Sequence, residues 1–477
     1  MNTNLDYSQE NEDAILARAS SLIGRSFEDI SNLSQHSQDK LNNKNKGNAG
    51  NFIEQHWFGI KNNSTPEPDF SEAGIELKVC PLKFNKKSLV VKERTKICSI
   101  NYLTLVNEVW SKSHAKRKLN KVLFVFYEYN NNNWQGQKVI NTALWELPPN
   151  ESLIETEWDK TKQTVANGLA HNLTERGYKV LSPCRSGSGG KDNKGNYRDL
   201  VKQPNNDKLA LKRAFSLKRP FVNQFWESLN NPERFESISD ALSLSKEDNL
   251  EQELLNKIER YVGKTIGDIS KELSIPIPNA KNAISIIINK IIGFHNTNSK
   301  IKEFEQAGIL IKTIPIKMKD LKPYEAISFP AIKFLEFENE EWDDSLLSEQ
   351  LTRLFFVPVS RDKNKGVEIK NRVLEQPFFW SPSPLEEMTI LNEWLQYQSE
   401  VCNGKSKVTR HYSKKGTYRE ITGLSKESDT RIIHMRPHGR NRNDRDVDSF
   451  GNSFVKHSFW LNKVFIQKLA KQYLISR

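Results

Sequence analysis

Residues 68–78 of the chain read PDFSEAGIELK, and residues 302–312, which lie 234 positions further on, read KEFEQAGILIK. Over the twelve positions that begin at Glu72, six residues are identical in the two copies, without a gap. The carboxylate Glu76 of the first copy is replaced by Leu310 in the second. The sequence therefore predicts a duplicated unit in which one copy has kept an acidic residue that the other has lost.

The duplication extends through most of the chain. Residues 23–31 (IGRSFEDIS) correspond to residues 262–270 (VGKTIGDIS), and each copy carries the Ser/Thr-x-x-Asp signal of a helix start. A helix predicted at residues 52–59 has its counterpart at residues 286–293. The mixture of apolar strands and amphipathic helices in each copy predicts an α/β (α+β) fold, in which a mixed β-sheet is flanked by helices.

Domain boundaries follow from the repeat and from a change in composition. Near residue 232 a helical pattern gives way to a Ser-rich and acidic stretch. We therefore predict a first domain at residues 1–232, a linker at residues 233–249 and a second domain at residues 250–477.

Composition limits the classes of function. The 477 residues carry a net charge of +12 and have a pI of about 9.2, so an anionic partner is expected. No apolar run has the length of a membrane span and the first residues are polar, so we expect a cytoplasmic protein with no membrane partner. The scattered Cys80, Cys98, Cys184 and Cys402 are interpreted as reduced thiols. ATP is not implied, because the sequence has no P-loop or dinucleotide fingerprint.

The first acidic copy has the residues of a metal site. Glu76 and Lys78 would project from one face of a strand, because side chains at i and i+2 point the same way, while Ile75 and Leu77 would face a core. Asp69 could reach the same place from the preceding turn. Two carboxylates beside an ammonium group favour Mg²⁺, which binds few carboxylates and keeps several waters. The lysine could position the attacking water for hydrolysis of a phosphodiester.

The spacing Asp-x6-Glu-x-Lys is weak evidence by itself, since a surface strand with solvated charges gives the same pattern. The comparison of the two copies is stronger, because polar positions change while the packing positions around them persist. One of these polar residues, Lys118, is expected in a basic turn that leads into a buried strand. The changed pairs are Glu54 and Ile288, Asp69 and Glu303, Glu76 and Leu310, and Lys118 and Gln350. This pattern predicts one copy with a catalytic metal site and one without.

These residues resemble a known family. The Lys-Gly pair at 46–47, Glu54, the turn at 68–70, the strand at 73–78 and the Lys-Leu pair at 118–119 resemble the MutH-type endonucleases, which have the PD-(D/E)xK restriction-endonuclease fold. Those enzymes cut at GATC. The duplicated form is similar to the type II restriction enzymes of the Sau family, which cleave both strands at GATC and carry a C-terminal copy that binds a second GATC as an allosteric effector. The resemblance covers nearly the whole chain and implies two tandem restriction-endonuclease-like domains.

The resemblance also implies roles for single residues near the acidic strand. Asp69 and Glu76 would bind the metal. Lys78 would position the attacking water, and Glu54 and Lys118 would be auxiliary catalytic residues.

Further residues are implied in DNA binding. They are Lys46, Arg185, Arg213 and Lys218 in the first half and Arg436, His438 and Trp460 in the second. Arg436 matches the base-reading arginine of the family, which suits a bidentate contact to guanine. The first half departs from this motif near Arg185, and Ser216 stands where the repair enzymes have an aromatic residue that contacts bases.

We therefore expect a Mg²⁺-dependent type II restriction endonuclease that hydrolyses phosphodiester bonds of double-stranded DNA at GATC, with the second half binding another site as an effector. A methylation-directed mismatch-repair nicking endonuclease is one alternative. A non-catalytic, sequence-specific DNA-binding regulator is another. The expected partners are GATC-containing DNA and, as part of a restriction system, a companion DNA methyltransferase. The chain is expected to be a monomer in solution that can dimerise on DNA.

Overall fold

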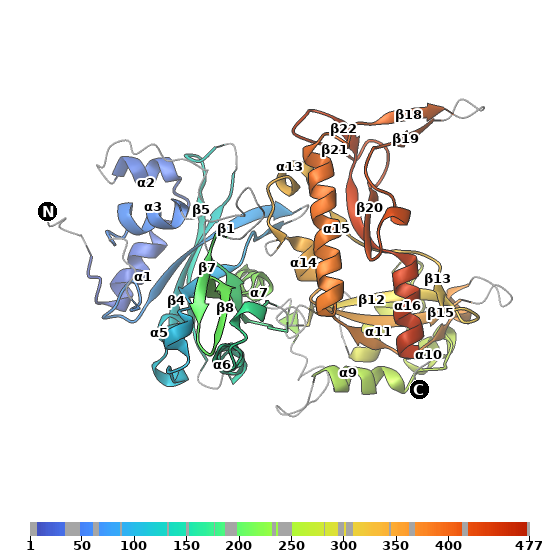
Figure 1. The fold of residues 1–477 in the computed structure, drawn as a ribbon, viewed down its shortest axis with the longest axis horizontal. Coiled ribbons are helices and arrows are strands. Elements are labelled where there is room, and N and C mark those ends of the chain that lie inside the picture. Colours follow the sequence, from blue (N-terminus) through green and yellow to red (C-terminus); the bar gives the residue numbers. More distant parts are fainter. Residues whose placement is uncertain are drawn as a thin grey trace. The chain divides into compact units, whose positions relative to one another are not determined.

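The chain divides into two compact units, Met1–Pro232 and Glu233–Arg477, which are described separately (Figure 1). The computed structural model describes residues 7–33, 48–60, 66–85, 88–130, 133–148, 152–175, 177–186, 198–230, 235–236, 250–280, 282–293, 300–301, 309–342, 345–361, 368–412 and 418–474. Most of the linker predicted at 233–249 lies outside these residues. Its described part, Phe235–Glu236 (β10), pairs in parallel with Lys300–Ile301 (β11).

Unit 1 contains both helices and strands. Its helices are α1 (Glu12–Ser20), α2 (Phe27–Leu33), α3 (Asn48–His56), α4 (Tyr102–Leu105), η1 (Trp110–Lys112), α5 (His114–Leu119), α6 (Ser152–Ala166), η2 (Ala170–Asn172) and α7 (Arg219–Asn230). Its strands are β1 (Glu76–Asn85), β2 (Ser88–Val91), β3 (Thr95–Ser99), β4 (Lys121–Glu128), β5 (Val139–Glu146), β6 (Leu181–Arg185), β7 (Leu200–Gln203), β8 (Asn206–Leu211) and β9 (Arg213–Leu217).

Unit 2 has a matching order of elements. Its helices are α9 (Leu250–Glu259), α10 (Ile266–Glu272), α11 (Ala283–Ile292), α13 (Phe334–Phe337), α14 (Leu346–Gln350), η6 (Ile369–Asn371), α15 (Pro384–Cys402), η7 (Glu427–Asp429) and α16 (Lys463–Leu474). Its strands, besides β10 and β11, are β12 (Ile309–Lys317), β13 (Lys322–Pro323), β14 (Ile327–Ala331), β15 (Arg353–Ser360), β16 (Val373–Leu374), β17 (Phe378–Trp380), β18 (Thr409–Tyr412), β19 (Tyr418–Ile421), β20 (Ile433–Pro437), β21 (Arg445–Val447), β22 (Ser453–Val455) and β23 (His457–Leu461).

The main sheet of unit 1 has the strand order β2-β1-β4-β5. β1 and β4 are parallel, and the outer strands are antiparallel to them, so the sheet is mixed as predicted. The central strand β4 has a nearly unbroken apolar sequence because both of its faces are covered. Leu123 and Val125 pack with α1, α2 and α3, while Phe124 and Phe126 face the layer that contains α6 and α7 (Figure 1).

The main sheet of unit 2 repeats this plan, with the order β13-β12-β15-β16 and with β17 also paired to β15. β12 and β15 are parallel. Leu310 pairs with Leu354 across them, as Glu76 pairs with Val122 across β1 and β4. The strand pairing thus reproduces the correspondence that was inferred from the sequence repeat, and the predicted tandem fold of two mixed sheets with flanking helices is confirmed.

The start of each unit is fixed by a turn that the repeat also preserves. Gly24 and Gly263 both have a φ of 83°, which favours glycine, and their N–H groups donate to Val139 and Leu374 at 2.8 Å. The predicted helix-start signals are confirmed in the following residues. The Oγ of Ser26 accepts a hydrogen bond from the N–H of Asp29 at 3.1 Å, and Thr265 accepts one from the N–H of Asp268, also at 3.1 Å.

Each unit has a second, smaller sheet, and several of the predicted DNA-binding residues lie on its strands. Its order is β3-β9-β6 in unit 1 and β14-β23-β20 in unit 2. A buried glutamate attaches a long helix to it in both units. Glu157 of α6 accepts hydrogen bonds from the N–H groups of residues 179–181, and Glu393 of α15 accepts them from residues 431–433. Each carboxylate thus satisfies three consecutive donors at the start of β6 or β20.

In the described part of the chain, no helix combines the length and the apolar character that a bilayer span requires.

Candidate active site

A tight turn before β1 brings the first acidic residue beside the strand. Phe70 and Ile75 exchange backbone hydrogen bonds of 2.9 and 3.1 Å, and Gly74 between them has a φ of 67°, which favours glycine. The chain therefore folds back before Glu76. As a result, Asp69 accepts a hydrogen bond from the N–H of Leu77 through Oδ2 at 2.9 Å. The prediction that Asp69 reaches the strand from the preceding turn is confirmed.

Glu76 is the centre of a buried ion-pair cluster and is only 1% exposed. Its Oε1 lies 2.5 Å from the Nζ of Lys78, which projects from the same face of β1. The Nζ of Lys118 lies 2.9 Å from Oε2 and 3.2 Å from Oε1. Ile75 and Leu77 are fully buried in the core on the other side. This burial rules out the alternative of a surface strand with solvated charges.

Lys118 reaches the cluster from a helix, and not from the basic turn that the sequence suggested. It lies in the last turn of α5, a helix capped at its N-terminus by Ser113, whose Oγ accepts a hydrogen bond from the N–H of Lys116. Six helical residues are too few to give a clear apolar period in the sequence. The buried strand that follows, β4, is as predicted.

Glu54 of α3 belongs to the same electrostatic environment. Burial raises the pKa of its carboxyl, and the charge of Asp69 raises it further. Lys78 lowers this pKa, Glu76 raises it and Lys118 lowers it, so all five residues are close enough to influence one another. Burial alone would lower the pKa of Lys78, but the charges of Glu76 and Asp69 raise it above its usual value. The structure thus brings the five predicted catalytic residues together.

The donor set suits a hard divalent cation bound by few protein ligands. Among the described residues, no group of three or more His, Cys, Asp or Glu side chains is arranged to enclose a metal ion. Mg²⁺ does not need such a cage, because it is held by one or two carboxylates together with waters and substrate oxygens. Asp69 and Glu76 offer oxygen donors only, and the Leu77 N–H fixes the orientation of the Asp69 carboxylate. These two residues therefore fit a Mg²⁺ ion that is completed by water and a phosphate.

The corresponding positions in unit 2 have lost two of the three carboxylates. Leu310 packs against the apolar core at the position of Glu76, and Ile288 of α11, at the position of Glu54, is fully buried. Lys312 remains at the position of Lys78, but its Nζ donates to the carbonyl of Ser328 at 2.9 Å. Burial lowers the pKa of Lys312 to about 8. Glu303, the counterpart of Asp69, lies outside the described residues.

The three DNA-binding residues predicted in unit 2 lie together on the small sheet. The guanidinium carbon of Arg436 lies 3.8 Å from the ring centroid of Trp460, a cation–π contact. The ring of His438 lies 4.7 Å from that of Trp460, and its Nδ1 is 2.9 Å from the Oγ of Ser458. Arg436 is thus held against a flat aromatic ring, with its guanidinium pre-oriented for a planar acceptor.

Strand pairing shows which residue of unit 1 occupies the place of Arg436. Arg436 lies opposite Ser458 in unit 2, and the corresponding pair in unit 1 is Cys184 opposite Ala214. Arg185 lies one residue further along the strand. Cys184 is therefore the residue of unit 1 that corresponds to Arg436, and no sequence motif had indicated it.

The small sheet of unit 1 has different chemistry on this face. The Sγ of Cys184 lies 2.6 Å from the Oγ of Ser216, where unit 2 has the Arg436–Trp460 contact. Lys96, on the neighbouring strand β3, lies opposite Ser216, and its Nζ donates to the Oγ of Ser186 at 2.9 Å. Lys96 was missed in the sequence analysis because it belongs to no motif.

The remaining DNA-binding candidates of unit 1 have partners inside the unit. The Nη2 of Arg185 lies 4.0 Å from Asp199. Arg213 is 8% exposed and donates through Nη1 to the carbonyl of Pro183 at 2.7 Å. Lys218 donates to the carbonyl of Tyr178 at 3.0 Å. Lys46 lies outside the described residues.

A mixed sheet that presents an acidic turn, a Glu-x-Lys strand and a lysine from a neighbouring helix defines a PD-(D/E)xK-type nuclease. The family model described as DNA mismatch repair enzyme MutH matches residues 58–157 and 292–393, one segment in each unit. The chain therefore matches the MutH family model twice, once in each of its two units.

The individual relatives differ in how much of this chain they match. The chain is 28% identical to the type II restriction enzyme Sau3AI of Staphylococcus aureus, over 97% of this chain and 98% of that protein. It is 25% identical to the DNA mismatch repair protein MutH of Haemophilus ducreyi, over 49% of this chain and 98% of that protein. The MutH protein of Pectobacterium atrosepticum is 27% identical, over 45% of this chain and 90% of its own length. The two MutH proteins thus match about half of this chain, whereas the restriction enzyme matches 97% of it.

Proposed function

We propose that the chain is a Mg²⁺-dependent type II restriction endonuclease that hydrolyses both strands of double-stranded DNA at GATC. The observation that carries this proposal is the difference between the two units. Unit 1 holds a buried Glu76 between two lysines and beside Asp69, whereas unit 2 has Leu310 at the same position of the same strand. The full-length likeness to Sau3AI supports a restriction enzyme over a single-domain repair enzyme.

Each residue of the cluster has a role that follows from its position. Asp69 and Glu76 would hold Mg²⁺, which, when bound, neutralises charge on the phosphoryl oxygens and lowers the pKa of a bound water. Lys78 would orient the attacking water, because its ammonium is already held at the rim of the acidic cluster by Glu76. Lys118 would face the negative charge that develops on the phosphate. Glu54, with its raised pKa, would accept a hydrogen bond from the water network or release a proton to it.

Unit 2 would bind a second GATC site without cutting it. Arg436, stacked on Trp460, is suited to a bidentate contact with guanine, and His438 lies beside the same ring. The lost acids leave too few oxygen ligands for catalysis. Lys46, Arg185, Arg213 and Lys218 remain proposed DNA contacts of unit 1. A companion methyltransferase and dimerisation on DNA are further parts of the proposal.

The test is the cleavage of unmethylated plasmids that carry two, one or no GATC sites, in the presence of Mg²⁺ or EDTA. The variants are Glu76→Gln and the matched control Glu72→Gln, which removes an exposed carboxylate from the same turn. We expect double-strand cuts at GATC that need Mg²⁺, disappear in Glu76→Gln and persist in Glu72→Gln. Faster cutting of the two-site plasmid would support the effector role.

Each alternative gives a different result in the same assay. A mismatch-repair nickase would leave open circles and would depend on accessory repair proteins for efficient cutting. A non-catalytic regulator would retard GATC plasmids without cutting them in Mg²⁺. Equal rates on one-site and two-site plasmids would contradict the effector role of unit 2, although the nuclease assignment would stand.

A further inference from the structure

Unit 2 contains a hairpin, β18–β19, in a connection that is much shorter in unit 1. In unit 1 the chain passes from the end of α6 at Ala166 to the start of β6 at Leu181. In unit 2 the corresponding connection runs from Cys402 to Ile433 and includes the hairpin. The described part of the unit 1 connection has only the short turn η2 as regular structure. The hairpin is therefore an addition to the unit that has lost its catalytic residues.

The hairpin is basic and exposed. Residues 405–421 include six Lys or Arg residues and a single acid, Glu420. All four residues of β18 are exposed, with Tyr412 68% exposed. The Arg410 side chain is 54% exposed. Figure 1 shows this ribbon projecting from the end of unit 2 that also carries β21 and β22.

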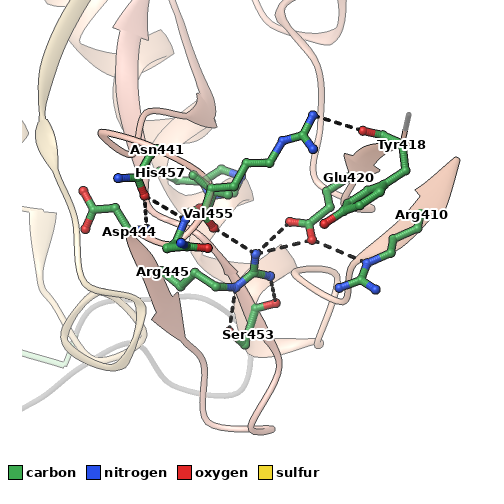
Figure 2. A network of polar contacts seen from close by, with 11 residues as sticks. Arg410, Tyr418, Glu420, Asn441, Asp444, Arg445, Ser453, Val455 and His457 are labelled. Carbon is green, nitrogen blue, oxygen red and sulfur yellow. Dashed lines mark hydrogen bonds and ion pairs between the residues drawn. The ribbon is translucent and has the colours of Figure 1, made fainter. Parts of the chain in front are cut away.

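An ion-pair network holds the hairpin against β21. The Nη1 of Arg445, on β21, donates to both carboxylate oxygens of Glu420, at 3.1 and 3.3 Å (Figure 2). Arg445 also donates to the Oγ of Ser453 at 2.9 Å and to its carbonyl at 2.7 Å. The Nε of Arg410 lies 3.7 Å from Glu420. An isolated two-stranded hairpin is only marginally stable in water, so this bracing fixes a ribbon that would otherwise be loose. It also engages the only acid of the basic segment.

Aromatic rings hold two of the arginines in place. The guanidinium carbons of Arg410 and Arg442 lie 4.9 and 5.0 Å from the ring centroid of Tyr418. Tyr412 packs against Tyr418, with 5.7 Å between ring centroids. Arg442 also donates to the backbone carbonyl of Tyr418 at 3.3 Å. Arg442 lies six residues after Arg436 in the chain. The hairpin is thus tied to the loop that follows the strand carrying Arg436.

We propose that the β18–β19 hairpin is a phosphate-binding arm, through which unit 2 grips the backbone of the duplex whose bases Arg436 and Trp460 contact. This inference rests on the proposed function of unit 2 as a DNA-binding unit. An antiparallel ribbon suits a duplex because it fits a DNA groove, and the cations of Arg410 on the ribbon and Arg442 on the adjoining loop, both held against Tyr418, can face the phosphates. The arm would add phosphate contacts to a unit that has Leu310 and Ile288 in place of two carboxylates.

The test measures DNA binding by the full-length chain in EDTA. Fluorescence anisotropy with a labelled GATC duplex, and with a duplex of scrambled sequence, is recorded over a range of salt concentrations for Arg410→Gln, Arg442→Gln and the double variant. The control is Lys370→Gln, which removes an exposed cation of unit 2 that is also paired with a carboxylate, Glu368. Hydrogen exchange of the hairpin peptides, with and without DNA, shows whether unit 2 is the part affected.

The expected result is a loss of affinity for both duplexes in the hairpin variants, with the slope of log Kd against log salt shallower by about one for each arginine removed. The control should bind like the wild type, and bound DNA should protect the hairpin from exchange. If the arginine variants keep the affinity and the salt slope of the wild type, and the wild type prefers GATC, the arm is refuted while the proposed function stands. No preference for GATC in the wild type would instead refute the proposed function. Polyglutamate and unlabelled duplex are each added as competitors of the labelled duplex. If polyglutamate displaces the labelled duplex as well as unlabelled duplex does, the assignment of the arm to DNA is refuted.

Discussion

Replacement of Glu76 by leucine would give unit 1 the residue that unit 2 already has at this position. Lys78 would then lose the neighbouring charge that does most to raise its pKa. Lys312 shows what a lysine at this strand position does without that acid, because burial lowers its pKa to about 8 from an ordinary value of 10.5. The same substitution that removes Glu76 from the proposed metal site should therefore leave the Lys78 ammonium group in a place where burial disfavours its charge.

The magnitude follows from the difference between the folded and the unfolded pKa. If Lys78 in Glu76→Leu behaves like Lys312, the folded state binds fewer protons than the unfolded state between pH 8 and pH 10.5, so stability rises with pH in this interval. Relative to a lysine whose pKa folding leaves unchanged, the cost is about 3 kcal/mol at pH 7.5 and about 1.5 kcal/mol at pH 9.5. Asp69 remains nearby, so these are upper values.

The assay is urea denaturation in EDTA at the two pH values, with hydrogen exchange read by mass spectrometry. Peptides from β1 and β4 report on unit 1, and peptides from β12 and β15 provide an internal control in the same molecule. We expect a lower unfolding free energy of unit 1 in Glu76→Leu, with part of the loss recovered at pH 9.5. Adding Lys118→Gln, which copies Gln350, should recover a further part. A loss of stability that does not change with pH would refute the assignment of the cost to Lys78.

Two other predictions concern stability. His457 is 1% exposed, and burial lowers its pKa to about 4, so the side chain is uncharged in the folded protein at neutral pH. Unit 2 should lose about 2 kcal/mol of stability between pH 7 and pH 5, because the imidazole takes up a proton in the unfolded state and not in the folded state. Thermal unfolding of His457→Gln should depend less on pH over this range, and an unchanged dependence would contradict the assignment. Glu157→Gln and Glu393→Gln should each destabilise their own unit by about 2 kcal/mol, because three backbone donors lose a charged acceptor. Hydrogen exchange of β6 and β20 peptides tests this, and equal losses in both units from one substitution would count against it.

Much of the catalytic cluster could be predicted from the sequence because its residues are close together in the chain. Asp69, Glu76 and Lys78 are placed by one turn and one strand, and the two-residue period of a strand fixes which of them share a face. The second copy then supplied a comparison that showed which polar residues could be lost. Lys118 was placed in the right neighbourhood but on the wrong element, because a helix of six residues leaves little periodic signal.

The proposed DNA-binding face was harder to predict because it is assembled from strands that are distant in the sequence. The counterpart of Arg436 depends on the register between β6 and β9, and a shift of one residue changes both the partner and the face of the sheet. For this reason the sequence pointed to Arg185, whereas the strand pairing places Cys184 at that position. The buried glutamates Glu157 and Glu393 were also missed, because their partners are backbone groups that carry no sequence signal.

From the amino-acid sequence alone one can predict a duplicated basic protein, a mixed α/β unit in each half and the loss of the carboxylates of Glu54 and Glu76 from the second half. These conclusions depend on composition, local periodicity and the comparison of two copies within one chain. The folded chain was needed to show that Glu76 is buried between Lys78 and Lys118, that Arg436 stacks on Trp460 and that Arg445 holds the β18–β19 hairpin in place. The physical reason is that burial and ion pairing depend on which surfaces meet when distant segments pack, and this is set by the register and by the packing of the whole unit.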